Sequence, residues 1–165
     1  MKILVVDDDR LVCASLKTII ESQGDIEVIG MGHNGQEAIT LYKSLKPDVL
    51  LMDIRMEVMT GLEAAVVILA EEKEAKILFL TTFLDDEYII KALKIGAKGY
   101  LIKQDFESIV PSLRAVQSGQ SVFGQDIVTK IPGLMSNSEQ KEQHHFDLSD
   151  KERELIDLVA QGLSN

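Results

Sequence analysis

Tryptophan is absent from this 165-residue sequence, and aromatic residues make up only 5% of it. Proteins that bind single-stranded nucleic acid stack bases on aromatic side chains, so this composition argues against that class. Positive charge is also scarce, because 17 Lys and Arg residues face 27 Asp and Glu residues and leave a net charge of −10. Such an acidic segment is not expected to bind a phosphate backbone by itself.

Cysteine and long hydrophobic runs are equally scarce. The one cysteine, Cys13, excludes an internal disulfide, and its helical surroundings predict a small core side chain. The apolar run at residues 3–6 is too short for a signal peptide or a membrane span. These features predict a protein of the reducing cytoplasm that does not associate with membranes.

What the sequence does contain is a regular alternation of short apolar runs and helical patterns. The runs are rich in Ile, Val and Leu, as in parallel strands that are covered on both faces. They occupy residues 3–6, 26–30, 49–52, 77–80 and 100–102. Capping boxes at residues 34–37 and 60–63 open helices, and Gly24, Gly96 and Gly119 stand where helices would end. The pattern predicts an α/β fold, a doubly wound five-stranded parallel sheet with helices on both faces.

The regularity fades after Gly119. Residues 120–148 predict a polar linker with room for one short helix, and the adjacent His144 and His145 in it lack the spacing of metal ligands. Residues 149–165 predict one amphipathic helix, which is marginally stable alone. We therefore expect a first domain over residues 1–119, the linker, and the first piece of an incomplete second domain.

Polar side chains end four of the five predicted strands. They are Asp7 and Asp8 after the first strand, Asp53 after the third, Thr81 and Thr82 after the fourth, and Lys103 after the fifth. In a doubly wound sheet of order 2-1-3-4-5 these four strands are neighbours, and ligands bind at their carboxyl ends. We therefore expect these side chains to line one pocket.

Electrostatics predicts what this pocket holds. Two carboxylates ~4 Å apart repel by roughly 4 kcal/mol at an effective dielectric near 20, and one lysine does not balance three of them. A hard divalent cation would, and carboxylate oxygens with retained waters suit Mg²⁺. With the Lys103 ammonium and the Thr81 hydroxyl at its rim, such a site suits a phosphoryl group.

Four motifs in this order resemble the receiver domain of two-component response regulators, a flavodoxin-like fold. The motifs are Val5-Val6-Asp7-Asp8, Asp53-Ile54-Arg55-Met56, Thr81-Thr82 and Gly96-Ala97-Lys98-Gly99-Tyr100-Leu101-Ile102-Lys103. The resemblance implies that a sensor histidine kinase phosphorylates Asp53. It also implies that Mg²⁺ binds Asp8, Asp53 and the backbone carbonyl of Arg55 directly, and Asp7 through water.

The same resemblance implies how the signal spreads. Lys103 would pair with the phosphoryl oxygens, and Thr81, beside Thr82, would move to hydrogen-bond one of them. Tyr100 would turn inward and alter the face formed by the fourth helix, fifth strand and fifth helix, which would favour a homodimer. The protein would then be a signalling switch and not an enzyme, although it assists its own phosphorylation and dephosphorylation.

The end of the chain resembles the opening of a LuxR-type helix-turn-helix domain, as in NarL/FixJ-type regulators. The resemblance lies in residues 148–154 and 158–165. The recognition helix of that domain would lie beyond Asn165, so DNA binding and transcription regulation would depend on the missing C-terminal domain. Glu57 departs from the receiver pattern, which usually has proline there.

Two other classes of function compete with the switch. An aspartyl phosphatase would need a second acid two residues after the nucleophile, where this sequence has Arg55. A flavodoxin-like electron carrier would need a phosphate-binding loop after the first strand, where three aspartates would repel the flavin phosphate. Both classes fit the sequence less well than the switch.

Overall fold

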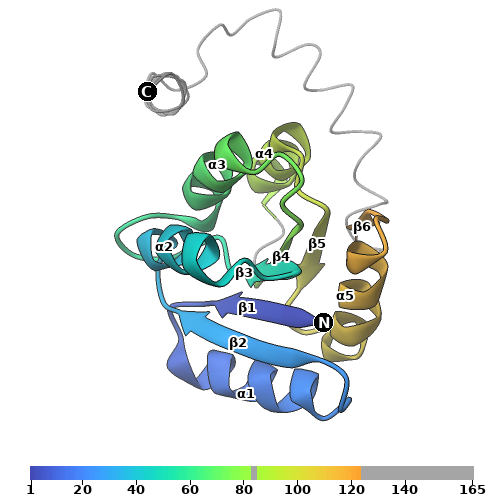
Figure 1. Cartoon of the computed structure of the whole chain (residues 1–165). Coiled ribbons are helices and arrows are strands. Elements are labelled where there is room, and N and C mark those ends of the chain that lie inside the picture. The colour runs from blue at the N-terminus through green and yellow to red at the C-terminus, as the bar shows by residue number, and fades with distance from the viewer. Residues whose placement is uncertain (83–84, 124–165) are drawn as a thin grey trace, which may run out of the picture.

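A computed structural model describes residues 1–82 and 85–123 of the chain (Figure 1). The predicted linker helix, the histidine pair and the LuxR-like segment at residues 149–165 lie outside the described residues. No helix within the described ranges is both long enough and apolar enough to span a bilayer.

One parallel sheet, with strand order β2-β1-β3-β4-β5-β6, forms the centre of the fold. Its strands are β1 (Lys2–Val6), β2 (Glu27–Gly32), β3 (Val49–Met52), β4 (Ile77–Thr81), β5 (Gly99–Ile102) and β6 (Val122–Phe123). The helices are α1 (Arg10–Glu21), α2 (Gly35–Leu45), α3 (Gly61–Glu71), α4 (Asp86–Ile95) and α5 (Ile109–Gln117), with a 3₁₀ turn, η1, at Phe106–Ser108. The predicted α/β class and the order 2-1-3-4-5 are confirmed.

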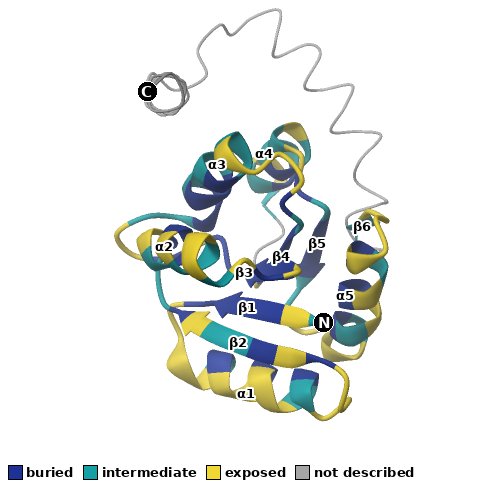
Figure 2. Cartoon of the chain, viewed as in Figure 1, coloured by how far each residue is buried: buried dark blue, intermediate teal, exposed yellow. Residues whose placement is uncertain are grey.

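Side chains along each strand alternate between two hydrophobic cores, because successive residues of a strand point to opposite faces. Leu4 and Val6 of β1 belong to the core under α2, α3 and α4, whereas Ile3 and Val5 belong to the core under α1 and α5. Figure 2 shows the central strands buried, with exposed residues on the outer surfaces of the helices. Burial on both faces explains why the strand sequences are almost continuously apolar.

Helix boundaries follow local capping chemistry. The side chains of Asp9, Asn34 and Thr60 accept hydrogen bonds from backbone N–H groups in the first turns of α1, α2 and α3. These bonds satisfy amide groups that have no partner within the helix. Gly96, with φ of 89°, caps α4 in the left-handed conformation that glycine adopts without a steric penalty.

The sheet extends one strand further than the sequence predicts. Residues Val122 and Phe123 pair with β5, and the N–H of Val122 donates to the carbonyl of Lys98 at 2.7 Å. Five strands were expected, so the strand count is corrected to six. The close approach requires a glycine on β5, because a Cβ on Gly99 would overlap the carbonyl oxygen of Val122.

Candidate metal and phosphoryl site

Hydrogen bonds of the sheet extend into the predicted site residues and fix their positions. The N–H of Asp53 donates to the carbonyl of Val6 at 2.9 Å, and the N–H of Lys103 donates to the carbonyl of Thr81 at 2.8 Å. The ends of β1, β3, β4 and β5 are thereby held side by side at one edge of the sheet. This arrangement follows from the confirmed strand order, whereas the prediction that the side chains line one pocket depends on the contacts between them.

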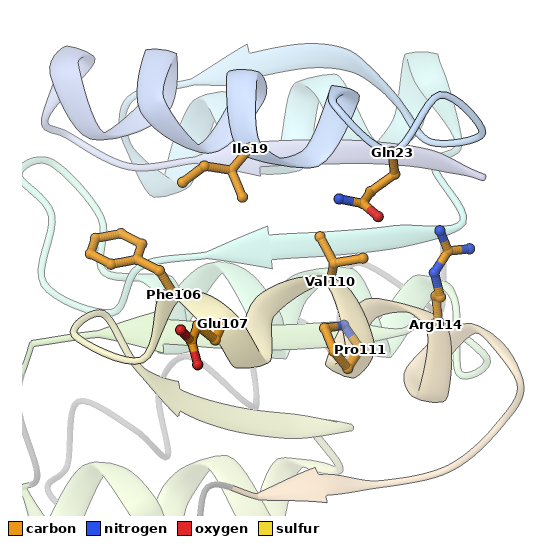
Figure 3. A pocket seen from close by; sticks show the side chains of 7 residues that line it. All are labelled: Ile19, Gln23, Phe106, Glu107, Val110, Pro111 and Arg114. Atoms are coloured by element: carbon orange, nitrogen blue, oxygen red, sulfur yellow. The ribbon is translucent and has the colours of Figure 1, made fainter.

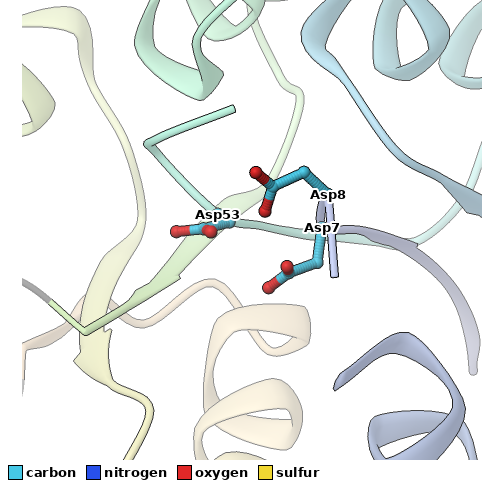
Figure 4. A group of neighbouring side chains, drawn as sticks. All are labelled: Asp7, Asp8 and Asp53. Carbon is cyan, nitrogen blue, oxygen red and sulfur yellow. The ribbon is translucent and has the colours of Figure 1, made fainter. Parts of the chain in front are cut away.

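Three carboxylates converge at this edge (Figure 4). Asp7, Asp8 and Asp53 each offer one oxygen, and these atoms all lie within 4.8 Å of one another. Asp7 and Asp53 are buried, with 2% and 6% of their surfaces exposed, whereas Asp8 is exposed to solvent. The cluster is therefore open to solvent on the side of Asp8.

The ammonium of Lys103 is the counterion of the two buried acids. Its Nζ lies 2.6 Å from Oδ2 of Asp7 and 3.1 Å from Oδ2 of Asp53. The other oxygens of these acids accept backbone hydrogen bonds, from Asp9 N to Asp7 Oδ1 at 2.9 Å and from Ile54 N to Asp53 Oδ1 at 2.8 Å. Each of these two acids therefore has one oxygen engaged by an amide and the other by Lys103, which lies closer to Asp7.

Three acids that share one ammonium cannot all be fully compensated. Burial, together with the charge of Asp7, raises the pKa of Asp53 above its ordinary value despite the neighbouring Lys103. Burial and the charge of Asp7 raise the pKa of Asp8 as well. Burial alone would lower the pKa of Lys103, but its hydrogen bond to Asp7 and the charge of Asp53 raise it, so the lysine stays charged.

This donor set fits a divalent cation. Three carboxylates and one ammonium leave two negative charges in excess, which one Mg²⁺ balances. The candidate ligands are hard oxygens, which Mg²⁺ prefers, and the open side at Asp8 gives room for the waters that it retains. The residues present could therefore hold this ion.

The remaining predicted residues differ in how deeply they are buried. Thr81 is buried at the end of β4, and Thr82 after it is exposed. Tyr100 is fully buried, with its ring centroid 6.5 Å from that of Phe79. The resemblance implied an inward turn of this ring on phosphorylation, but in this structure the ring is already inside.

One contact beside the site was not predicted. The Nε of Arg55 donates to the hydroxyl of Tyr88 on α4 at 3.2 Å, and the guanidinium carbon lies 5.6 Å from the centre of the same ring. Arg55 and Tyr88 are 33 residues apart, and no motif in the sequence links them.

Cys13 is buried as predicted, and burial raises the pKa of its thiol to about 11.

A separate hollow lies between α1 and α5 (Figure 3). It is lined by Ile19, Gln23, Phe106, Glu107, Val110, Pro111 and Arg114. None of these residues belongs to the acidic cluster, and their chemistry is mainly apolar. This hollow is not a second metal site.

Comparison with known proteins identifies the family. Residues 3–114 match the family model of the response regulator receiver domain. The chain belongs to this family. Over its whole length it is 36% identical across 166 aligned residues to the response regulator protein VraR of Staphylococcus aureus strain Mu3, of which the alignment covers 78%.

Solved structures agree with this assignment. A LuxR-family two-component response regulator from Aurantimonas sp. SI85-9A1 gives a TM-score of 0.77 at 28% identity, over 80% of this chain and 95% of that one. A chain of the CheX-CheY-BeF3-Mg+2 complex from Borrelia burgdorferi gives a TM-score of 0.67 at 25% identity, over 70% of this chain and 88% of that one. Response regulators are signalling proteins, and the LuxR-family relatives associate this receiver with two-component transcription regulation.

Proposed function

We propose that this receiver is a switch in which Asp53 accepts a phosphoryl group from a phosphohistidine of a sensor histidine kinase. A bond forms between a carboxylate oxygen of Asp53 and phosphorus, while the bond between phosphorus and the imidazole nitrogen breaks and leaves its electron pair on the imidazole. The observation that carries this proposal is the convergence of three carboxylates within 4.8 Å of one another, with Lys103 against two of them.

Each residue of the cluster has its own role in the proposal. Asp8, Asp53 and the backbone carbonyl of Arg55 would bind Mg²⁺ directly. Asp7 would bind it through water, which suits the carboxylate that Lys103 holds more closely, at 2.6 Å against 3.1 Å for Asp53. When bound, the ion supplies positive charge for the phosphoryl oxygens, and the Borrelia burgdorferi complex contains Mg+2 and BeF3 according to its description.

Lys103 and Thr81 would recognise the phosphoryl group once it is attached. The ammonium of Lys103 lies 3.1 Å from an oxygen of Asp53, so it needs only a small movement to contact oxygens attached to that carboxylate. The hydroxyl of Thr81 would hydrogen-bond another oxygen, with the exposed Thr82 beside it. Thr81 and Tyr100 belong to neighbouring paired strands, so a shift at Thr81 would reach the α4-β5-α5 face through this pairing.

The output is proposed to be dimerisation and DNA binding. Residues 1–119 would form the receiver, 120–148 the linker, and 149–165 the start of a LuxR-type domain that binds DNA when complete. The LuxR-family relatives support this arrangement. The homodimer would use the α4-β5-α5 face, where β6 pairs with β5, so a partner would also meet β6.

Intact-mass spectrometry after treatment with acetyl phosphate tests the phosphorylation. We expect one phosphoryl group on the wild-type chain in Mg²⁺ and none when the metal is chelated. Asp53→Asn should abolish the mass gain, whereas the control Asp48→Asn changes an exposed acid outside the cluster and should retain it. The same mass gain in the Asp53→Asn chain would assign the nucleophile elsewhere.

Sedimentation velocity tests the dimer separately. Beryllofluoride with Mg²⁺ mimics the acylphosphate and should increase the sedimenting mass of the wild-type chain. Equal mass with and without the mimic would refute dimerisation while leaving the phosphorylation proposal intact.

A further inference from the structure

The side chain of Arg55 joins the loop after β3 to helix α4. Its Nε donates a hydrogen bond of 3.2 Å to the Tyr88 hydroxyl, and the guanidinium carbon lies 5.6 Å from the centre of the Tyr88 ring. The contact therefore combines a hydrogen bond with a cation–π interaction. Arginine suits both, because its planar charged group presents several donors and stacks on aromatic rings.

The neighbours of Arg55 anchor the same loop on its inner side. Ile54 and Met56 are buried in the core under α2, α3 and α4. The alternate residues Arg55 and Glu57 are exposed. Further along, Met59 N donates to Glu57 O at 2.8 Å in a turn that places Val58 at φ of 70°. The loop is thus held from inside by two apolar side chains and from outside by Arg55.

Tyr88 connects this loop to the start of helix α4. It lies in the first turn of α4. The Asp85 side chain caps this helix by accepting a hydrogen bond of 2.9 Å from the N–H of Glu87. Its partly buried ring packs against the core that contains Tyr100. The Arg55–Tyr88 contact therefore joins the loop after β3 to the first turn of α4.

We propose that Arg55 and Tyr88 form a latch that positions the loop after β3 for Mg²⁺, with Tyr88 as a positioning residue. The inference rests on the metal site of the proposed function. Asp53 and residue 55 are two proposed ligand positions on one loop, so a loop already held at residue 55 loses less conformational freedom when the cation binds. Linkage is reciprocal, so the cation in turn stabilises the latch and the first turn of α4.

Isothermal titration calorimetry of the whole chain with MgCl2 tests the latch. Tyr88→Leu and Arg55→Met should each weaken Mg²⁺ affinity roughly threefold to tenfold, as expected for loss of one exposed cation–π contact and one hydrogen bond. The loss of affinity in the double variant should be smaller than the sum of the two single losses, because both variants remove the Arg55–Tyr88 interaction. Tyr88→Phe keeps the ring, so its Mg²⁺ affinity should fall less than that of Tyr88→Leu.

Two further measurements separate positioning from a general structural effect. Tyr42→Leu makes the same chemical change on α2, away from the latch, and should leave Mg²⁺ affinity unchanged. Hydrogen exchange of amides 86–92 should slow on addition of Mg²⁺ in the wild-type chain and not in Tyr88→Leu. Unchanged affinity in both single variants, or losses that add in the double variant, would overturn the latch.

The outcomes also distinguish this inference from the function on which it rests. If the wild-type chain binds Mg²⁺ and Tyr88→Leu binds it equally well, the latch fails and the metal site stands. If the wild-type chain gives no binding heat and no Mg²⁺-dependent change in hydrogen exchange, the metal site fails and the latch fails with it.

Discussion

The ammonium of Lys103 lies 2.6 Å from Oδ2 of Asp7 and, at 3.1 Å, farther from Oδ2 of Asp53. Asp7 is therefore the closer partner of the lysine, and Asp53 is the less compensated of the two buried acids. In the proposed function, Asp7 would hold the lysine while Asp53 would provide the reacting oxygen.

Replacement of Lys103 by Met should destabilise the Mg²⁺-free protein and make it more dependent on the metal. The change leaves two buried carboxylates without their cation, which costs roughly 3–5 kcal/mol of unfolding free energy. Mg²⁺ should recover part of this loss because it supplies charge to the same oxygens. Urea denaturation with and without MgCl2 measures both effects.

Lys43→Met is the matched control for this substitution. Lys43 pairs with Glu71 at 3.0 Å, but both side chains are exposed, so its loss should change stability by less than about 1 kcal/mol and independently of Mg²⁺. Equal losses in the two variants would contradict the role given to Lys103.

Mg²⁺ affinity should fall as the pH falls, and the decline should begin above the ordinary carboxyl pKa of 3.8. Burial raises the pKa of Asp53 and of Asp8 in the metal-free protein, so protons compete with the cation at higher pH than they would at a free carboxyl. Calorimetric titrations over a pH series measure this dependence. An affinity that stays constant down to the ordinary carboxyl range would contradict the raised pKa values.

The same shift has a defined sign for stability. Because the pKa of Asp53 is higher in the folded protein than in the unfolded chain, the folded protein binds this proton more tightly. As the pH falls through the raised pKa, protonation of Asp53 should therefore contribute stability to the metal-free fold. Asp53→Asn should remove this contribution.

Most of the sheet could be predicted because local patterns and tertiary burial agree. Short Ile-, Val- and Leu-rich runs mark β1 to β5, and glycines mark helix ends. Strand β6 could not be predicted, because two residues carry no periodicity and their pairing depends on how closely the chain approaches Gly99.

The candidate site was predictable to the same degree and for a similar reason. Carboxyl ends of neighbouring parallel strands meet at one edge, so Asp7, Asp53 and Lys103 could be brought together from the strand order alone. The Arg55–Tyr88 contact depends on the orientation of α4 against a loop 33 residues earlier, which the sequence does not encode locally.

Val58→Asn should stabilise the loop that follows Asp53. Val58 has φ of 70°, where a β-branched side chain is strained, and its 86% exposure means that little packing is lost on substitution. Asparagine tolerates this conformation, so we expect a gain of about 1 kcal/mol in unfolding free energy. Val58→Ala keeps a Cβ but loses the branch, so its gain in unfolding free energy should be smaller. A loss of stability in Val58→Asn, measured by urea denaturation, would refute the strain.

Gly99→Ala should detach β6 from the sheet. A Cβ at this position would overlap both the Val122 carbonyl oxygen and the Cδ1 of Leu78, and the backbone oxygen cannot rotate away as a side chain can. We expect a loss of roughly 1–3 kcal/mol in unfolding free energy, together with faster hydrogen exchange at the Val122 amide, which donates to Lys98.

Gly96→Ala separates this steric effect from backbone strain. Gly96 has φ of 89°, but a Cβ there would meet nothing within 4 Å, so its substitution costs only the left-handed conformation, about 1 kcal/mol. Exchange at the Val122 amide should stay slow in this variant. If hydrogen exchange at the Val122 amide speeds up equally in both alanine variants, the pairing of β6 depends on the overall stability of the fold and not on the close approach at Gly99. If exchange at this amide stays slow in both variants, the close approach does not control the pairing of β6.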